Sequence, residues 1–131
     1  MEAALIAHLL ATAGITAVVG QRITWGRRDQ GGALPAIVLH RIDGAPDYHL
    51  TGASGLVESR VQVDCWGSSY GSAKSVARTV DTALSAARFT QGAVRFDAIL
   101  IVDERDDTFD ETATAIFRTS LDLQVHHARA S

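Results

Sequence analysis

Ten residues in the middle of the chain, VESRVQVDCW at positions 57–66, alternate strictly between two kinds of side chain. Small and mostly apolar residues point one way: Val57, Ser59, Val61, Val63 and Cys65. Mostly polar residues point the other way: Glu58, Arg60, Gln62, Asp64 and Trp66. A period of two is typical of a half-buried antiparallel strand. The segment therefore predicts a sheet with one face packed on a core.

A second alternation of the same kind stands near the end of the chain. Phe117, Thr119, Leu121, Leu123 and Val125 alternate with Arg118, Ser120, Asp122, Gln124 and His126. Apolar runs bounded by glycine and proline predict further strands at residues 22–25, 36–42 and 93–102. The segments 26–34, 43–56 and 103–114 are expected to be loops, the last of them strongly charged.

Two helices are expected. Residues 71–88 have a helical spacing of small and apolar side chains, with Ser68 or Ser69 as the N-cap. The first helix covers residues 2–12, and a short helical turn follows from Thr16 to Val19. This apolar start resembles a signal peptide, but no Lys or Arg precedes it, so a core helix is the favoured interpretation.

Length and pattern together predict one α+β domain over residues 1–131. We expect a mainly antiparallel sheet of four to five strands, with two main helices packed on one face. In this arrangement the inward residues of the two alternating strands face the stripe of the second helix. The expected contact joins Val61, Val63, Leu121 and Leu123 to Val76, Val80 and Leu84.

Composition and motifs argue against several function classes. The net charge of −3 gives no reason to expect nucleic-acid or membrane binding. The single cysteine, Cys65, points inward and is expected to act as a small apolar residue. The five histidines have no metal-ligand spacing, and the glycine-rich loops lack a phosphate-binding pattern. We therefore expect no catalytic residue, metal or cofactor.

The run DERDDTFDE at positions 103–111 holds six carboxylates and one arginine. A solvated loop and a charged assembly surface are both compatible with it. A Ca²⁺ or Mg²⁺ site is a third possibility, although the spacing of a calcium loop is missing. Trp66 lies on the polar side of its strand, where it either belongs to a protein interface or folds under the following turn.

Several stretches resemble the tail-completion (tail-terminator) proteins of long-tailed bacteriophages and the related gene transfer agents. The first stretch holds Arg41, Gly44, Pro46, Tyr48, Leu50 and Gly52, and the second is RVQVDCW at 60–66. The motif returns as DERD at 103–106 and RTSLDL at 118–123. The resemblance implies an α+β fold and a structural, non-enzymatic role.

It further implies a hexameric ring that caps the tail tube and joins it to the head-side connector. Its partners are then further copies of itself, the tail-tube protein and the connector or stopper protein, with no nucleic-acid readout and no membrane. The expected location is the head-proximal end of the virion tail, after assembly in the bacterial cytoplasm. The alternative is a small cytoplasmic enzyme or ligand-binding domain.

Opposite charges on separate loops and exposed aromatic residues suit head-to-tail contacts in such a ring. We expect interface residues among Arg27, Arg28, Asp47, Tyr48, His49, Trp66, Asp103, Glu104, Arg105, Asp106 and Asp107.

Overall fold

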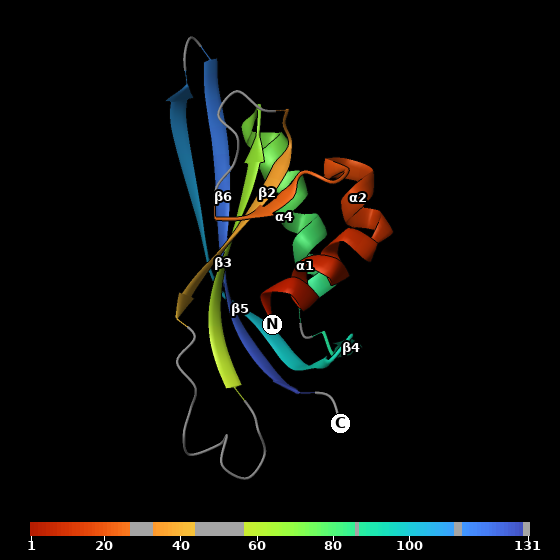
Figure 1. Ribbon diagram of the computed structural model, residues 1–131. Helices are drawn as coiled ribbons and strands as arrows, with labels where there is room; N and C mark the ends of the chain where they lie inside the picture. Colours follow the sequence, from red (N-terminus) through yellow and green to blue (C-terminus); the bar gives the residue numbers. More distant parts are fainter. Residues whose placement is uncertain (27–32, 44–56, 86, 112–113, 130–131) are drawn as a thin grey trace.

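A computed structural model of the chain describes residues 1–131 except 27–32, 44–56, 86, 112–113 and 130–131 (Figure 1). It contains three helices: α1 (Glu2–Ala11), α2 (Ala13–Val19) and α4 (Tyr70–Leu84). It contains six strands: β1 (Ile23–Trp25), β2 (Ala36–Asp43), β3 (Val57–Gly67), β4 (Phe89–Gln91), β5 (Val94–Glu111) and β6 (Thr114–Arg129).

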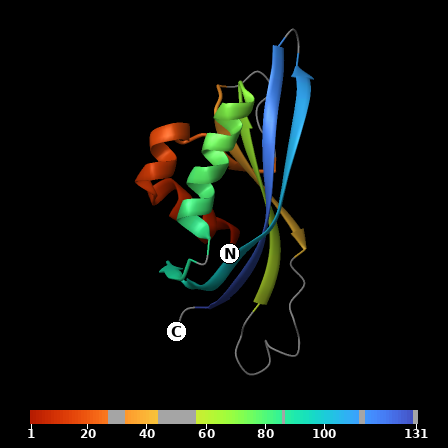
Figure 2. The same ribbon diagram turned by 180° about the vertical axis from the view of Figure 1, so that it is seen from behind.

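The strands form one curved sheet in the order β1-β2-β3-β6-β5-β4. Every pairing is antiparallel except that of β1 with β2, which is parallel. The helices lie on one face of the sheet, with α4 against β3 and β6 and α2 packed on α4 (Figure 2). The α+β class and the one-sided helix layer were therefore predicted correctly, whereas four to five strands and two main helices were too few.

The largest error concerns the charged stretch 103–114, which was expected to be a loop. Residues up to Glu111 continue β5, which pairs with β6 from Val94↔Arg129 to Glu111↔Thr114. Charged side chains occupy both faces of this part of the strand, so the apolar alternation that reveals a strand is missing. The ion pairs described below compensate these charges.

The core contact was predicted correctly. Val61, Val63, Leu121 and Leu123 are at most 1% exposed and belong to one cluster with the apolar stripe of α4. The register Val63↔Leu121 places two of them side by side on the helix-facing side of the sheet. Burial of this aliphatic surface is the main favourable contribution to folding.

Helix α4 begins where the sequence indicated, because the Ser69 side chain accepts a hydrogen bond from the Ser72 backbone N–H at 3.1 Å. The helix ends at Leu84 instead of residue 88. Immediately before it, β3 passes very close to its first turn. A Cβ atom added at Gly67 would lie 2.5 Å from the backbone nitrogen of Ala73, so this crossing requires glycine.

The N-terminal segment is a bent pair of helices, with α1 and α2 at 83° to one another. Leu5 and Leu9 are fully buried, which agrees with a core helix, but Leu10 is 38% exposed and does not share their face. The expected turn from Thr16 is the end of a longer helix that begins at Ala13. Among the described residues no single helix is long and apolar enough to span a bilayer, and only this bent pair meets the length and composition criteria together.

A row of aromatic rings closes the core near the chain termini. His8 stacks on Phe89, Phe89 on Phe96, and Phe96 lies against His127, with centroid distances of 3.6, 4.6 and 6.3 Å. His127 is 9% exposed, and its Nε2 forms a hydrogen bond of 2.9 Å with the Ser59 hydroxyl. Burial, together with the positive N-terminus and nearby cationic side chains, lowers the pKa of His127 to about 4.

This histidine should make the stability of the fold depend on pH. The unfolded chain binds a proton near pH 6.5 and the folded chain only near pH 4, so protons favour unfolding between these values. We expect the free energy of unfolding to fall by about 2 kcal/mol from this group between pH 7.5 and 5.0. Urea titrations at the two pH values measure the loss.

A matched pair of variants separates His127 from the other titrating groups. His127→Gln should remove most of that pH-dependent loss, while His126→Gln, on the other side of β6, should keep it. A wild-type loss that persists in His127→Gln would contradict the assignment.

Candidate interaction surface

The face of the sheet turned away from the helices carries a polar network around Asp64. Although no described helix covers this face, Asp64 is only 2% exposed. Its Oδ1 accepts hydrogen bonds from the Ser120 hydroxyl at 2.7 Å and the Gln62 amide at 2.8 Å. Its Oδ2 lies 3.1 Å from His40 Nε2 and 3.7 Å from an Arg118 nitrogen. Since β2, β3 and β6 each contribute a partner, the carboxylate links three strands.

Exchange of this carboxylate should therefore cost stability without changing the fold. In Asp64→Asn the amide keeps one acceptor for Ser120 and Gln62, but directs a donor toward the Arg118 guanidinium. We expect a loss of about 1–3 kcal/mol, the usual cost of an unsatisfied buried polar group. Asp81→Asn is the control, because its partner Arg78 is half exposed and such surface pairs contribute about 0–1 kcal/mol. Urea unfolding measures both losses. Equal losses in the two variants would show that the Asp64 network contributes no more to the free energy of unfolding than a surface ion pair does.

Next to this network, Trp66 takes part in a stack of side chains on the β5–β6 hairpin, near the end where β5 turns into β6. The Arg118 guanidinium carbon lies 5.5 Å from the Trp66 ring centre and 4.8 Å from that of Phe109. Arg118 also binds Asp107 at 2.8 Å. Trp66 thus contacts side chains of β5 and β6 in its own subunit, and Phe109, at 39% exposure, is the more accessible of the two rings.

The charged part of β5 presents its side chains to both sides of the sheet. On the helix side, Glu104 binds Lys74 and Arg78 of α4, and Asp106 binds Lys74 at 3.0 Å. Hydrogen bonds from these cations lower the pKa of Glu104, and the same contacts raise that of Lys74. Two of the expected interface carboxylates are therefore bound to the helix of their own subunit.

On the other side of β5, Arg105 binds two carboxylates with one nitrogen. Asp103 lies at 2.9 Å and Asp122 of β6 at 2.7 Å. One cation thus serves two anions, and Asp103 is 53% exposed. Asp103 thus lies on the helix-free face and shares the Arg105 cation with Asp122.

The remaining expected interface residues, Arg27, Arg28, Asp47, Tyr48 and His49, lie outside the described residues. Sequence reasoning missed the partners Lys74, Arg78 and Arg118, because their pairing depends on the β5 register. It also missed three exposed apolar residues on strands, Ile42, Leu100 and Val102, because each stands in a segment that reads as buried strand.

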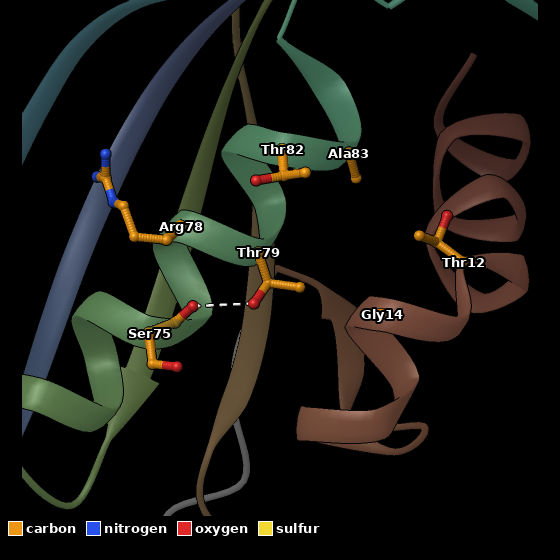
Figure 3. A pocket seen from close by; sticks show the side chains of 7 residues that line it. All are labelled: Thr12, Gly14, Ser75, Arg78, Thr79, Thr82 and Ala83. Atoms are coloured by element: carbon orange, nitrogen blue, oxygen red, sulfur yellow. Dashed lines mark hydrogen bonds between the residues drawn. The ribbon is translucent and has the colours of Figure 1, made fainter.

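The pockets give little support to a ligand-binding function. A hollow of about 450 Å³ between α2 and α4 is lined by Thr12, Gly14, Ser75, Arg78, Thr79, Thr82 and Ala83. Figure 3 shows that the Arg78 side chain points away from α2, toward its carboxylate partners, and that Thr79 donates to the Ser75 carbonyl. Within the described part of the chain, no three His, Cys, Asp or Glu side chains are grouped to hold a metal ion. Cys65 is fully buried, and burial raises the pKa of its thiol.

Comparison with known proteins decides the family. Residues 3–127 match the family described as tail completion protein gp17. The chain belongs to this family of tail completion proteins. It is accordingly a structural protein of a virion tail and not an enzyme, as the resemblance in its sequence implied.

A solved structure with the same fold agrees with this. It is described as the virion of a native gene transfer agent particle, and one of its chains superposes with a TM-score of 0.72. The match covers 98% of this chain and 94% of that one, at 19% sequence identity. At such low identity the likeness concerns the fold. No curated protein matches this tail completion protein significantly.

Proposed function

We propose that this tail completion protein forms a closed ring of six copies on the head-proximal end of the tail tube. There it ends tube polymerisation and offers a surface to the head-side connector or stopper protein. Assembly takes place in the cytoplasm of the bacterial host. The observation that carries the proposal is the family match over residues 3–127, and the fold shared with a chain of a virion particle supports it.

The shape of the subunit suits such a position between two partners. The end of β5 at Glu111 lies at one end of the sheet, and the end of β2 at Asp43 and the start of β3 at Val57 lie at the other (Figure 1). A subunit with strands that reach both ways has separate ends for the tube and for the connector. We assign Arg27, Arg28, Asp47, Tyr48 and His49 to these end contacts as part of the proposal.

The charged segment of β5 has a smaller role here than its composition suggested. Glu104, Asp106 and Asp107 are engaged by cations of the same subunit, so their replacement would disturb the hairpin before it affected a partner. Asp103 and Arg105 remain proposed contact residues, because both side chains are about half exposed.

A tube-length assay tests the proposal. The tail-tube protein from the same gene cluster is allowed to polymerise with and without this protein, and the tubes are imaged by negative stain. We expect growth to stop, and additional density on one end of each tube. An unrelated protein of the same size serves as the control. Tubes with unchanged lengths and bare ends would refute the capping function.

A further inference from the structure

The outer edge of β5 is largely open. On this side β5 pairs with β4, and the pairing joins only Val94, Arg95 and Phe96 to residues 89–91. From Asp97 to Glu111, no other described strand pairs with the outer edge of β5. An open strand edge is a ready contact for another chain unless charges or bulges protect it.

The opposite edge of the sheet is open over a shorter stretch. β1 pairs with β2 through Ile37, Val38 and Leu39 only. Beyond these residues, the outer edge of β2 from His40 to Asp43 has no partner strand in the described part of the chain. The described strands of a single subunit therefore present two different open edges, one on each side of the sheet.

Each open edge carries an exposed apolar side chain at a β-bulge. Val102 stands at the irregularity between Ile101 and Asp103, and it is 50% exposed. Ile42 stands at the irregularity between Arg41 and Asp43, and it is 61% exposed. Bulges turn side chains out of the regular alternation of a strand. Both bulges thus direct an aliphatic group toward solvent at a sheet edge, where a monomer gains nothing from it.

The two apolar sites lie at the same level of the sheet. A single row of paired residues crosses it, from Asp43 through Arg60 and Gln124 to Leu100. Ile42 stands one position before Asp43 at one end of this row. Val102 stands two positions after Leu100 at the other end. A closed ring has no rise from one copy to the next, so the two patches that meet must lie at the same height. The cross-strand row meets that requirement in a ring whose axis runs along the strands.

The charges beside the two sites are complementary. Arg60, next to Ile42, forms no ion pair with the described side chains, although the strand register places it opposite Asp43. Beside Val102, in contrast, Asp103 and Asp122 share the single cation of Arg105 and leave an excess of negative charge. Charges at the rim of an apolar contact select the partner and its register more than they add affinity.

From these observations we infer that the open edge of β5 in one copy docks on the open end of β2 in the next copy. Ile42 meets Leu100 and Val102 at the centre of the contact, and Arg60 faces Asp103 and Asp122 at its rim. The inference rests on the proposed ring and specifies its subunit contact. The occupant of the β5 edge is a second copy of this chain.

Crosslinking tests the contact even when the assembly is weak. The double variant Ile42→Cys/Val102→Cys is treated with a short bismaleimide reagent in the presence of tail-tube protein. The native Cys65 is fully buried and does not compete. We expect a ladder of covalent oligomers up to six copies, because each copy is joined on both sides.

The control is Leu10→Cys/Tyr70→Cys, in which both positions are exposed but lie on helices away from the two edges. The single variants Ile42→Cys and Val102→Cys should also yield no ladder. A ladder from Ile42→Cys/Val102→Cys no stronger than that of the control would overturn the inference.

Charge substitution tests the same contact by loss and rescue. Ile42→Lys and Val102→Asp should each reduce ring formation at least ten-fold, since each places a charge in an apolar contact. The chain that carries both should regain most of the loss, because the lysine of one copy then faces the aspartate of the next. Ile42→Lys/Val102→Lys should not regain it, and Leu10→Lys should assemble as the wild type does.

These outcomes separate the inference from the proposed function. If Ile42→Lys and Val102→Asp each still form rings and cap tubes, the proposed function stands and the subunit contact lies elsewhere. If the wild-type protein does not cap tubes and Ile42→Cys/Val102→Cys does not crosslink into a ladder, both the function and the contact are wrong.

Discussion

Leu121→Ala should remove about 3–4 kcal/mol from the free energy of unfolding. Leu121 is fully buried in the centre of β6, beside Val63 and beneath the apolar stripe of α4. Removal of a buried leucine side chain costs the transfer free energy of its carbons and leaves a cavity that the surrounding core fills only in part. Domains of this kind are stable by only about 5–15 kcal/mol, so the loss should be large on that scale.

Urea unfolding followed by circular dichroism measures this change. Val63→Ala, from the same pair, should lose about 2–3 kcal/mol. The control Leu10→Ala removes the same atoms from a side chain that is 38% exposed, and it should lose well under half as much. A loss below about 0.5 kcal/mol for Leu121→Ala, the range of ordinary surface changes, would mean that the register of β6 is wrong.

Gly67→Ala should destabilise the protein by about 2–3 kcal/mol through overpacking. The added methyl group would lie 2.5 Å from the Ala73 backbone nitrogen and 2.9 Å from the Ser72 side chain. A backbone atom in the first turn of α4 cannot move aside as a flexible side chain can. The helix would have to shift away from β3, at the typical cost of an overpacked core.

Gly71→Ala provides a control of the same chemistry four residues later. A Cβ atom at Gly71 meets nothing within 4 Å, and the residue lies in the first turn of α4. Alanine is better than glycine inside a helix by about 0.5–1 kcal/mol, so this variant should be as stable as the wild type or more so. A Gly67→Ala variant as stable as Gly71→Ala would contradict the close crossing of β3 and α4.

The sequence predicted the parts of this fold in which one periodicity prevails. The alternation in β3 and β6 and the helical spacing in α4 each identify the buried side. Because all three must bury that side, their mutual packing follows. The alternation also gave the inward position of Cys65, and Ser69 is one of the two serines that were candidates for the helix cap.

The sequence failed where tertiary contacts override local pattern. Asp103 to Asp107 form a strand in which Lys74, Arg78 and Arg118 bind carboxylates on both faces. These cations come from other elements, so no local pattern can reveal the pairing. β4 has only three residues and leaves no clear periodicity.

The candidate surface was predicted only in part for the same reason. Trp66 and the acidic run were identified as unusual features of the sequence. Most of the acidic side chains that the structure describes, however, form ion pairs within the subunit. The apolar edge sites at Ile42 and Val102 depend on which strands lie at the edges of the sheet. Strand order follows from the whole chain and not from any segment of it.

The mass and symmetry of the assembled species test the central claim most directly. The protein is mixed with tail-tube protein, and the capped tube ends are examined by electron cryomicroscopy. The account predicts one closed ring of six copies of the 13.9 kDa subunit at one end of each tube, with β5 of each copy against β2 of the next. Single copies scattered along the tube wall, or tube ends without a ring, would contradict it.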